Sequence, residues 1–218
     1  MHIEPGIIAP AKVALANVVA AGVVAYYARD LLKRPADIVR TGLAALFFSL
    51  FMQSLHVNVG PSELHFVGAM AIYLTLGFLP TLLGFAAGLL LQGLLFEPVD
   101  LPQLAVNSLS LIVPLIAVHY SVGRQLRAAM AGRVVSWGSI VKLDAMYYSG
   151  VTAMVGFWLL AAEVATPLAA WASFASSYLL IVICEPLFTL AVVRLLKRHE
   201  NKRLIAACFN IQSLKLAN

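Results

Sequence analysis

The stretch LHFVGAMAIYLTLGFLPTLLGFAAGLLLQGLLF, residues 64–96, contains no Asp, Glu, Lys or Arg and decides how the chain is folded. One straight helix of this length would be roughly 50 Å long, whereas the hydrocarbon core of a membrane is about 30 Å thick. Pro80 stands near its middle, and proline interrupts a helix because it lacks the N–H group. We therefore predict two short antiparallel spans, 64–79 and 81–96, which leave a depression at one face for a binding loop.

The rest of the chain is similarly apolar. Hydrophobic residues make up 61% of it and charged residues 11%, whereas a soluble domain is about half apolar and a quarter charged. Two cysteines exclude a disulfide framework. The composition predicts an all-α, polytopic membrane protein with seven transmembrane helices. The five further spans are expected at 12–32, 38–55, 104–122, 143–162 and 168–196.

Basic side chains divide the connections between these spans into two groups. Every Lys and Arg except Lys12 lies in or beside connection 29–40, connection 123–142 or the tail. Positive residues mark the cytoplasmic side of a membrane protein. Seven spans place these segments on one face, so the amino terminus is expected outside and the carboxyl terminus in the cytoplasm.

We expect a single transmembrane domain over residues 1–218. It would consist of a metal-binding amino-terminal loop at 1–10, a seven-helix bundle at 11–196 and a basic cytoplasmic tail at 197–218.

The first two residues, Met1 and His2, have the groups of a metal chelator. A free terminal amine, the backbone nitrogen of His2 and its ring Nδ1 can wrap one ion in two fused rings. One further imidazole would complete a square of four nitrogens, which suits Ni(II) or Cu(II) and, less strictly, Co(II). The bulky His2 is expected to protect Met1 from removal.

The predicted topology places four other polar residues at the same outer face. They are His56, His65, Gln92 and Asn107. Either histidine could supply the fourth nitrogen.

Two further features stand within the predicted spans. Glu185 is a carboxylate at membrane depth, which is a functional hypothesis by default, although Pro186 beside it would also fit a locally polar kink. Gly84 and Gly88, and the small residues of 41–49, allow close approach of helices. We interpret them as packing within the chain.

Three stretches together resemble the CbiM/NikM family, the substrate-specific membrane (S) component of cobalt and nickel energy-coupling-factor (ECF) transporters. They are MHIEPGIIAP at 1–10, MQSLHVNVGPSELHFVGA at 52–69 and LLLQGLLFEPVDLPQLAVNSLSL at 89–111. The resemblance covers most of residues 1–120, and the later spans agree in hydropathy only. It departs where the family's Gly-Thr-Ser-Gly-His is Gly-Pro-Ser-Glu-Leu-His at 60–65, and where a second Asn of the family is Ser110.

The resemblance implies a site for Co(II) or Ni(II) as the transported substrate, with the amino-terminal loop folded into an outward-facing pocket. Its ligands would be the amine and amide of Met1 and His2, the His2 ring and the ring of His65. His56 stays open as the alternative ligand. Gln92 and Asn107 match polar positions around the loop and pocket in similar proteins.

The resemblance also implies partners. The sequence contains no G-x-x-x-x-G-K-[ST] nucleotide loop, so any ATP hydrolysis falls to other chains. Those would be a transmembrane coupling (T) component and two ATPase (A) subunits of an ABC-type importer in a prokaryotic inner membrane. This chain would then be no enzyme, bind no nucleotide, and contact lipid but no nucleic acid.

Two rival functions follow from the residues alone. A secondary divalent-cation transporter would use Glu185, His119 and His65 as an ion or proton path. A membrane metalloenzyme would use His56 and His65 as ligands, but it lacks a paired base and nucleophile.

Overall fold

Helices make up most of the described chain, which in this computed structural model comprises residues 6–54, 56–59, 62–126, 134–163, 167–212 and 214–216. The α-helices are α1 (Pro10–Leu31), α2 (Pro35–Ser54), α3 (Ala69–Leu76), α4 (Phe78–Leu95), α5 (Leu104–Val118), α7 (Trp137–Leu160), α8 (Leu168–Arg198) and α9 (Arg203–Cys208). A 3-10 helix η1 (Pro98–Gln103) precedes α5, and a π-helical turn η2 (His119–Gly123) follows it. The strands are β1 (His56–Val59), β2 (Ser62–His65), β3 (Val134–Val135) and β4 (Lys215–Leu216).

Proline and serine residues set where several helices begin. Pro10 opens α1 at a position where a missing N–H costs no helical hydrogen bond. Pro167 immediately precedes α8. The Ser136 hydroxyl caps α7 by accepting a hydrogen bond from the Ser139 N–H at 3.2 Å. Because such signals can be read from the sequence, the spans predicted to begin at 12 and 168 begin close to the observed starts of α1 and α8.

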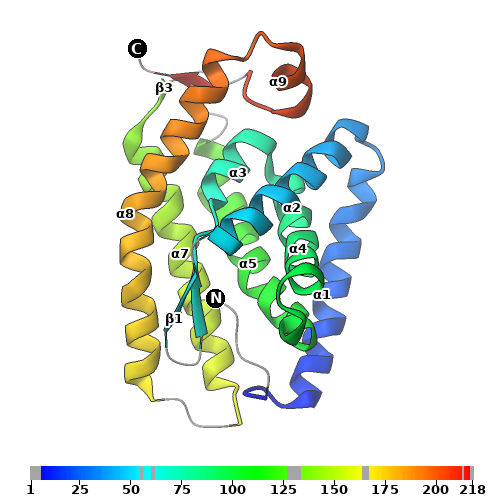
Figure 1. Cartoon of the computed structure of the whole chain (residues 1–218), viewed down its shortest axis with the longest axis vertical. Coiled ribbons are helices and arrows are strands. Elements are labelled where there is room, and N and C mark those ends of the chain that lie inside the picture. Colours follow the sequence, from blue (N-terminus) through cyan, green and yellow to red (C-terminus); the bar gives the residue numbers. More distant parts are fainter. Residues whose placement is uncertain are drawn as a thin grey trace.

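A β-hairpin occupies part of the predicted third span, so the expected continuous helix over 64–79 is wrong, although the fold is mostly helical as the all-α prediction expects. β1 and β2 pair antiparallel, with His56 opposite His65. Two valines in β1 alternate with polar residues, a pattern that favours a strand. Helix α3 begins only at Ala69 and has eight residues, which is about 12 Å at helical rise. In Figure 1 the hairpin fills the lower part of the bundle and α3 the upper part.

The break in the apolar stretch 64–96 lies at Gly77, three residues before the predicted break at Pro80. Gly77 has a φ of 104°, which favours glycine because a Cβ atom would clash there. Its N–H donates to the Tyr73 carbonyl at 3.1 Å and ends α3. Pro80 instead lies in the first turn of α4, where proline is tolerated.

Within the described residues, five helical segments are long and apolar enough to cross a membrane. They are Pro10–Leu31, Pro35–Ser54, Phe78–Leu95, Pro98–Leu126 and Leu168–Arg198. Helix α7 also has 24 residues, but its first half carries Lys142 and Asp144. The chain is therefore a mostly helical, multi-pass membrane protein. Its seven crossings and its orientation stay predictions.

Helices α2 and α4 meet at small residues. A Cβ atom on Gly84 would lie 3.1 Å from the Ala45 backbone nitrogen, and one on Gly88 would lie 2.6 Å from the Phe48 ring. The contact can form only because both positions are glycine. The prediction that Gly84 and Gly88 serve packing within the chain is thereby confirmed.

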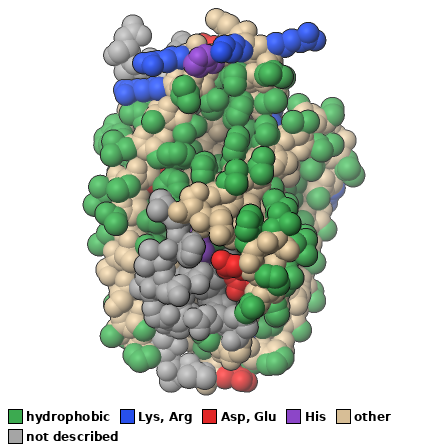
Figure 2. Space-filling view, in the orientation of Figure 1, with side chains coloured by type: hydrophobic (Ala, Val, Ile, Leu, Met, Phe, Trp, Pro, Cys, Tyr) green, Lys and Arg blue, Asp and Glu red, His purple; other side chains and the backbone are tan. Residues whose placement is uncertain are grey.

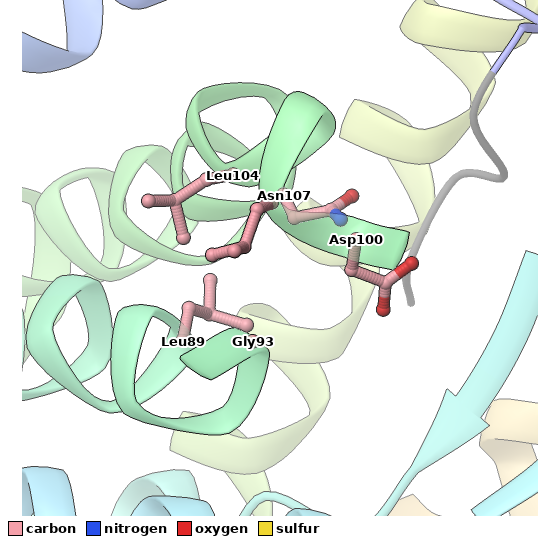
Figure 3. Close-up of a pocket in the computed structure, with 6 residues that line it drawn as sticks. Leu89, Gly93, Asp100, Leu104 and Asn107 are labelled. Atoms are coloured by element: carbon pink, nitrogen blue, oxygen red, sulfur yellow. The ribbon is translucent and has the colours of Figure 1, made fainter. Parts of the chain in front are cut away.

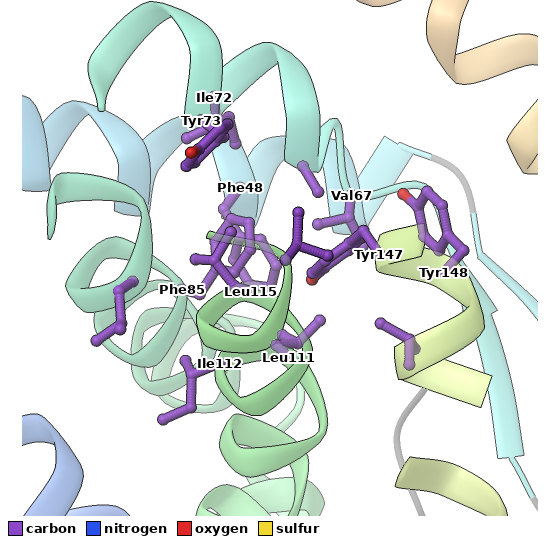
Figure 4. Close-up of a cluster of buried hydrophobic side chains, with 14 of the residues drawn as sticks. Phe48, Val67, Ile72, Tyr73, Phe85, Leu111, Ile112, Leu115, Tyr147 and Tyr148 are labelled. Carbon is purple, nitrogen blue, oxygen red and sulfur yellow. The ribbon is translucent and has the colours of Figure 1, made fainter. Parts of the chain in front are cut away.

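The centre of the bundle is filled by aromatic and branched side chains, including Phe48, Tyr73, Phe85 and Tyr147 (Figure 4). Every residue of α3 is buried. Helix α1, in contrast, buries only Ala16 and Ala20 and exposes apolar side chains along its remaining faces. Such an outward apolar surface suits contact with lipid.

Charged side chains gather at the ends of the bundle. Figure 2 shows Lys and Arg at the end that carries α9. At the other end the Lys12 ammonium donates to the Ala161 carbonyl at 2.6 Å, and the Glu163 N–H donates to the Ile7 carbonyl at 3.2 Å. These contacts attach residues 7–12 to the connection between α7 and α8.

The carboxyl-terminal tail folds back onto the bundle. The Asn210 N–H donates to the Thr75 carbonyl, in the last turn of α3, at 2.7 Å. Ile211 and Leu214 are fully buried, and the Phe209 ring stacks on Phe47 of α2 with centroids 6.4 Å apart. Residues 209–212 and 214 therefore form part of the packed structure.

Candidate metal centre

His65 is the predicted metal ligand that the structure describes most fully. It is the last residue of β2, three residues separate it from the start of α3, and it is 0% exposed. Its Nδ1 lies 3.4 Å from the Met52 carbonyl oxygen on α2. A carbonyl oxygen only accepts, so this contact favours the tautomer that carries its proton on Nδ1 and its lone pair on Nε2. In metal sites such a contact through the second ring nitrogen orients the imidazole.

His56 is the other candidate from mid-chain. It lies directly opposite His65 in the hairpin, so the structure brings the two predicted alternatives to neighbouring backbone positions. Sequence reasoning placed both at one face but did not predict that they pair.

Gln92 is buried in α4 and connects that helix to α2. Its Oε1 accepts a hydrogen bond from the Ser49 hydroxyl at 3.1 Å, and its Nε2 donates to Gln53 Oε1 at 2.9 Å. Gln53 follows Met52, whose carbonyl contacts His65. Gln92 thus holds the part of α2 that touches the imidazole, and both ends of its amide are engaged.

Asn107 lies in the first turn of α5, is buried, and lines a small pocket (Figure 3). Asp100 of η1 lines the same pocket, together with four apolar or glycine residues: Leu89, Gly93, Leu101 and Leu104. The carboxylate and the amide give this mostly apolar pocket a polar rim. Asn107 therefore lies where α4, η1 and α5 meet.

Met1 and His2 lie outside the described residues. The described chain begins at Gly6, and Ile8 and Ala9, two and three residues later, are already buried. Among the described residues, no group of three or more His, Cys, Asp or Glu side chains could hold a metal ion. A metal centre at His65 would therefore need donors from beyond these residues, and the predicted chelate of Met1 and His2 would supply them.

His119 and His199 make hydrogen-bond contacts outside the hairpin. His119 begins η2, its Nδ1 lies 2.9 Å from the Tyr73 hydroxyl, and its ring stacks on Phe78 with centroids 3.7 Å apart. The His199 Nδ1 lies 2.9 Å from the Leu195 carbonyl near the end of α8.

Glu185 is fully buried within α8, which continues through Pro186. Its Oε1 accepts a hydrogen bond from the Met70 N–H at 3.3 Å, and its Oε2 accepts one from the Tyr148 hydroxyl. The carboxylate therefore joins α8 to α7 and to the start of α3, the helix that follows His65.

Asp144, on α7, is a buried carboxyl that sequence reasoning missed. It is the second residue of the predicted span 143–162 and lies two residues after Lys142, where a charge is ordinary at the edge of a span and does not indicate a buried site. The available signal was its spacing from Tyr147 and Tyr148, because residues three and four apart share a helix face.

Comparison with known proteins decides the family. The model of the family "CbiM: Cobalt uptake substrate-specific transmembrane region" matches residues 2–203. The chain belongs to the CbiM family. The matched region of this CbiM protein contains His2, all the described candidate residues and both buried carboxyls, and it ends before most of the tail.

Two solved structures share the fold of this CbiM protein. A crystal structure of a truncated transition metal transporter is 21% identical, with 91% of this chain and 99% of that chain covered and a TM-score of 0.71. A second crystal structure of a transition metal transporter is 20% identical, with 94% and 96% covered and a TM-score of 0.70. Among curated proteins, none matches this sequence. Family and fold together assign the chain to transition metal transport.

Proposed function

We propose that this CbiM protein captures Co(II) or Ni(II) at the outer face of a prokaryotic inner membrane and passes it to the cytoplasm as the S component of an ATP-driven ECF transporter. The ligands are the terminal amine of Met1, the backbone nitrogen and ring Nδ1 of His2, and Nε2 of His65. The observation that carries the proposal is the fully buried His65, held against the Met52 carbonyl in a chain of the cobalt uptake family.

The chemistry of the four nitrogens explains their order in the chain. A five-membered ring joins the amine to the amide nitrogen, and a six-membered ring joins that nitrogen to Nδ1, so two residues supply three donors. His65 closes the square from a separate element and thereby fixes the loop to the bundle. Because the amide proton must leave, binding releases protons and weakens as the pH falls.

The decisive experiment adds two glycines before Met1, because a single glycine would place the His2 ring third from the amine, where the amine, two amide nitrogens and the ring could form a new four-nitrogen site. The extension removes the amine from the chelate and spares every histidine. Since loss of an outer-shell partner alone costs about 10–100-fold in affinity, loss of a ligand should weaken Co(II) binding to the purified protein by at least about 100-fold. Two glycines added after Asn218 are the matched control and should leave affinity unchanged. Unchanged affinity in the amino-terminal variant would refute the chelate.

The choice between the two hairpin histidines has its own test. His65→Ala should reduce Co(II) affinity as strongly as the two amino-terminal glycines, and His56→Ala should reduce it less. His199→Ala, in the tail segment, is the control. The reverse order for His65 and His56 would assign the fourth ligand to His56.

The partners follow from the missing nucleotide loop and from the family. The family is described as substrate-specific, which implies other proteins that supply transport and energy. We propose a T component and two A subunits, which meet the basic end of the bundle. Metal uptake by cells should stop when the ATPase gene is deleted.

The rival function, a secondary transporter, is favoured by one observation, the fully buried Glu185. It predicts uptake that persists without the ATPase and fails in Glu185→Gln. The ATPase deletion therefore separates the two functions.

A further inference from the structure

A groove runs along one side of the bundle between α1 and α7, with α5 as its floor. Both α1 and α7 pack against α5, and they flank it in Figure 1. The groove has a volume of about 540 Å³ and receives side chains from all three helices. Its walls include Leu15 of α1 and Phe157 of α7, which are both exposed, so it opens onto the lipid-facing surface of the bundle.

The spacing of the lining residues shows that each helix contributes one face. On α1 they include Lys12, Leu15 and Val19, which are three and four residues apart, and on α5 they are Leu109 and Val113. Most of α5 is buried, yet Val113 is 37% exposed. The groove therefore reaches down to an inner helix of the bundle, because α1 and α7 stand apart above it.

The other wall is a face of α7 that runs from Met154 to Ala161. The Lys12 ammonium donates to the Ala161 carbonyl at 2.6 Å, so the two walls meet at this end. Because α1 begins and α7 ends here, this end of the groove lies at the surface of the membrane. From there the groove extends inward over seven residues of each wall, which is about 10 Å at helical rise.

Lys12 is the only charged residue that lines the groove, and every other lining residue is apolar. Its carbon stem forms part of the wall, while its ammonium lies at the end of the helices. Lysines near helix ends typically place their charge at the membrane surface in this way. An ammonium has three N–H donors, so Lys12 can bind an anion in addition to the Ala161 carbonyl.

The length of the groove distinguishes between possible occupants. A helix that crosses the hydrocarbon core is about 30 Å long, so a partner helix would place only about a third of its length in a groove of about 10 Å. A phospholipid fits better, because its phosphate lies at the membrane surface and its acyl chains begin directly below. The groove has the same order of parts, with a cation at the surface and apolar walls below it.

We propose that this groove binds one phospholipid, with an acyl chain over Leu109 and Val113 and with the phosphate accepting hydrogen bonds from the Lys12 ammonium. The chain lies between Leu15 on α1 and Phe157 on α7. The bound lipid fills the space between two helices that are joined mainly through α5.

Packing and charge, rather than hydrophobicity, give this lipid its preference over the surrounding bilayer. Lipid chains are as apolar as the groove, so apolar side chains alone provide no preference. Contact with three helices and one charge pair provide it instead, and a basic residue near a membrane surface contributes roughly a factor of five in affinity. We therefore expect the lipid to stay bound during a mild detergent extraction that removes the bulk lipid.

The test reconstitutes the full chain in vesicles of dioleoyl phosphatidylglycerol, extracts it in mild detergent and counts the retained lipid by native mass spectrometry. We expect one phospholipid per chain. Lys12→Met keeps an apolar stem but removes the charge, so it should lower the retained fraction about fivefold. Lys33→Met, which removes an exposed charge just after α1, is the matched control and should retain the lipid.

Two further variants fill the groove. Val113→Trp places a large ring on its floor, and Leu15→Trp places one on its α1 wall, so each should remove the retained lipid. Val18→Trp is the control, because Val18 is exposed on α1 but does not line the groove. Helical circular dichroism and elution volume show that each variant is folded, and Leu15→Trp changes only an exposed side chain.

Three results would overturn the lipid site. An absence of retained phospholipid in the native chain would leave the groove to a partner helix. Retention that Leu15→Trp and Val113→Trp do not change would place the lipid elsewhere on the protein. Retention that Lys12→Met does not change, or displacement of the phospholipid by an equal concentration of oleate, would refute the contact between Lys12 and the phosphate.

Discussion

The contacts of α2 with α4 and of α7 with α8 both bury polar side chains, but they treat them differently. Between α2 and α4, the Gln92 amide uses both of its ends, on Ser49 and Gln53. Between α7 and α8, Asp144 and Thr189 have no partner within the described residues. A fully bonded polar network holds one geometry, whereas an unpartnered buried oxygen costs free energy and fixes no geometry.

The two contacts also differ in how closely the helices approach. Gly84 and Gly88 let α4 lie against the backbone of α2. Helices α7 and α8 are separated by aromatic side chains, among them Tyr148 and Tyr178, whose ring centroids are 5.2 Å apart. We therefore regard the α2–α4 contact as the rigid support of the candidate metal centre. Helices α7 and α8 are held further apart by their larger side chains.

The largest effect is expected at the rigid contact. Gly84→Leu would push a side chain into Ala44 and the Ala45 backbone and should destabilise the protein by about 3 kcal/mol or more, measured by thermal unfolding in detergent. Gly22→Leu on α1, where nothing lies within 4 Å of an added Cβ, is the matched control. Equal melting temperatures would show that α2–α4 is not closely packed.

The next largest effect is expected at Glu185. Glu185→Leu leaves the Tyr148 hydroxyl and the Met70 N–H without their acceptor and should cost about 2 kcal/mol of unfolding free energy. Glu185→Gln keeps one acceptor oxygen and should cost less. If the two variants unfold alike, Glu185 does not join α8 to α3 through hydrogen bonds.

A smaller effect is expected at Gln92. Gln92→Leu removes the hydrogen bonds to Ser49 and Gln53 and should cost about 1.5 kcal/mol of stability. It should also weaken Co(II) binding about tenfold, because α2 would hold the Met52 carbonyl less firmly against His65. The exposed Gln125→Leu serves as control, and unaltered metal affinity would remove Gln92 from the support of the site.

The smallest effect on stability is expected at Asp144, although it is as deeply buried as Glu185. Asp144→Leu removes a carboxyl that has no partner among the described residues, so unfolding free energy should change by no more than about 0.5 kcal/mol or should increase. A loss as large as that of Glu185→Leu would mean that α7–α8 depends on Asp144 for its packing.

The sequence predicts these two contacts to different extents. Gly84 and Gly88 stand four residues apart on one helix face, so close helix packing was predictable from local spacing. Glu185 was also visible, as a charge within an apolar span. The burial of Asp144 was not predicted, because it stands beside Lys142 at the start of a span, where a charged residue is ordinary.

The hairpin shows the limit of sequence reasoning for the fold. An apolar run does not distinguish a buried strand from a buried helix, so residues 64–68 were assigned to a helix with the rest of the stretch. The break was placed at Pro80 because proline is the stronger general signal, but the first turn of α4 tolerates proline and Gly77 provides the turn.

The candidate site was predictable in part. His65, Gln92 and Asn107 were expected at one face, and each of the three is buried. The pairing of His56 with His65 depends on register between strands, and the Gln92 network depends on contacts between distant helices. No local pattern specifies either. The chelate of Met1 and His2 stays a prediction.

The fold-back of residues 209–212 and 214 bears on how the protein should be produced. The family-matched region stops at residue 203, yet the Asn210 N–H satisfies a carbonyl in the last turn of α3, and Ile211 and Leu214 are enclosed by the bundle. Trimming the gene to the matched region would strip a hydrogen bond and an apolar cover from the shortest helix of the interior. An affinity tag should therefore be joined after Asn218 through a spacer, with the native carboxyl-terminal residues kept.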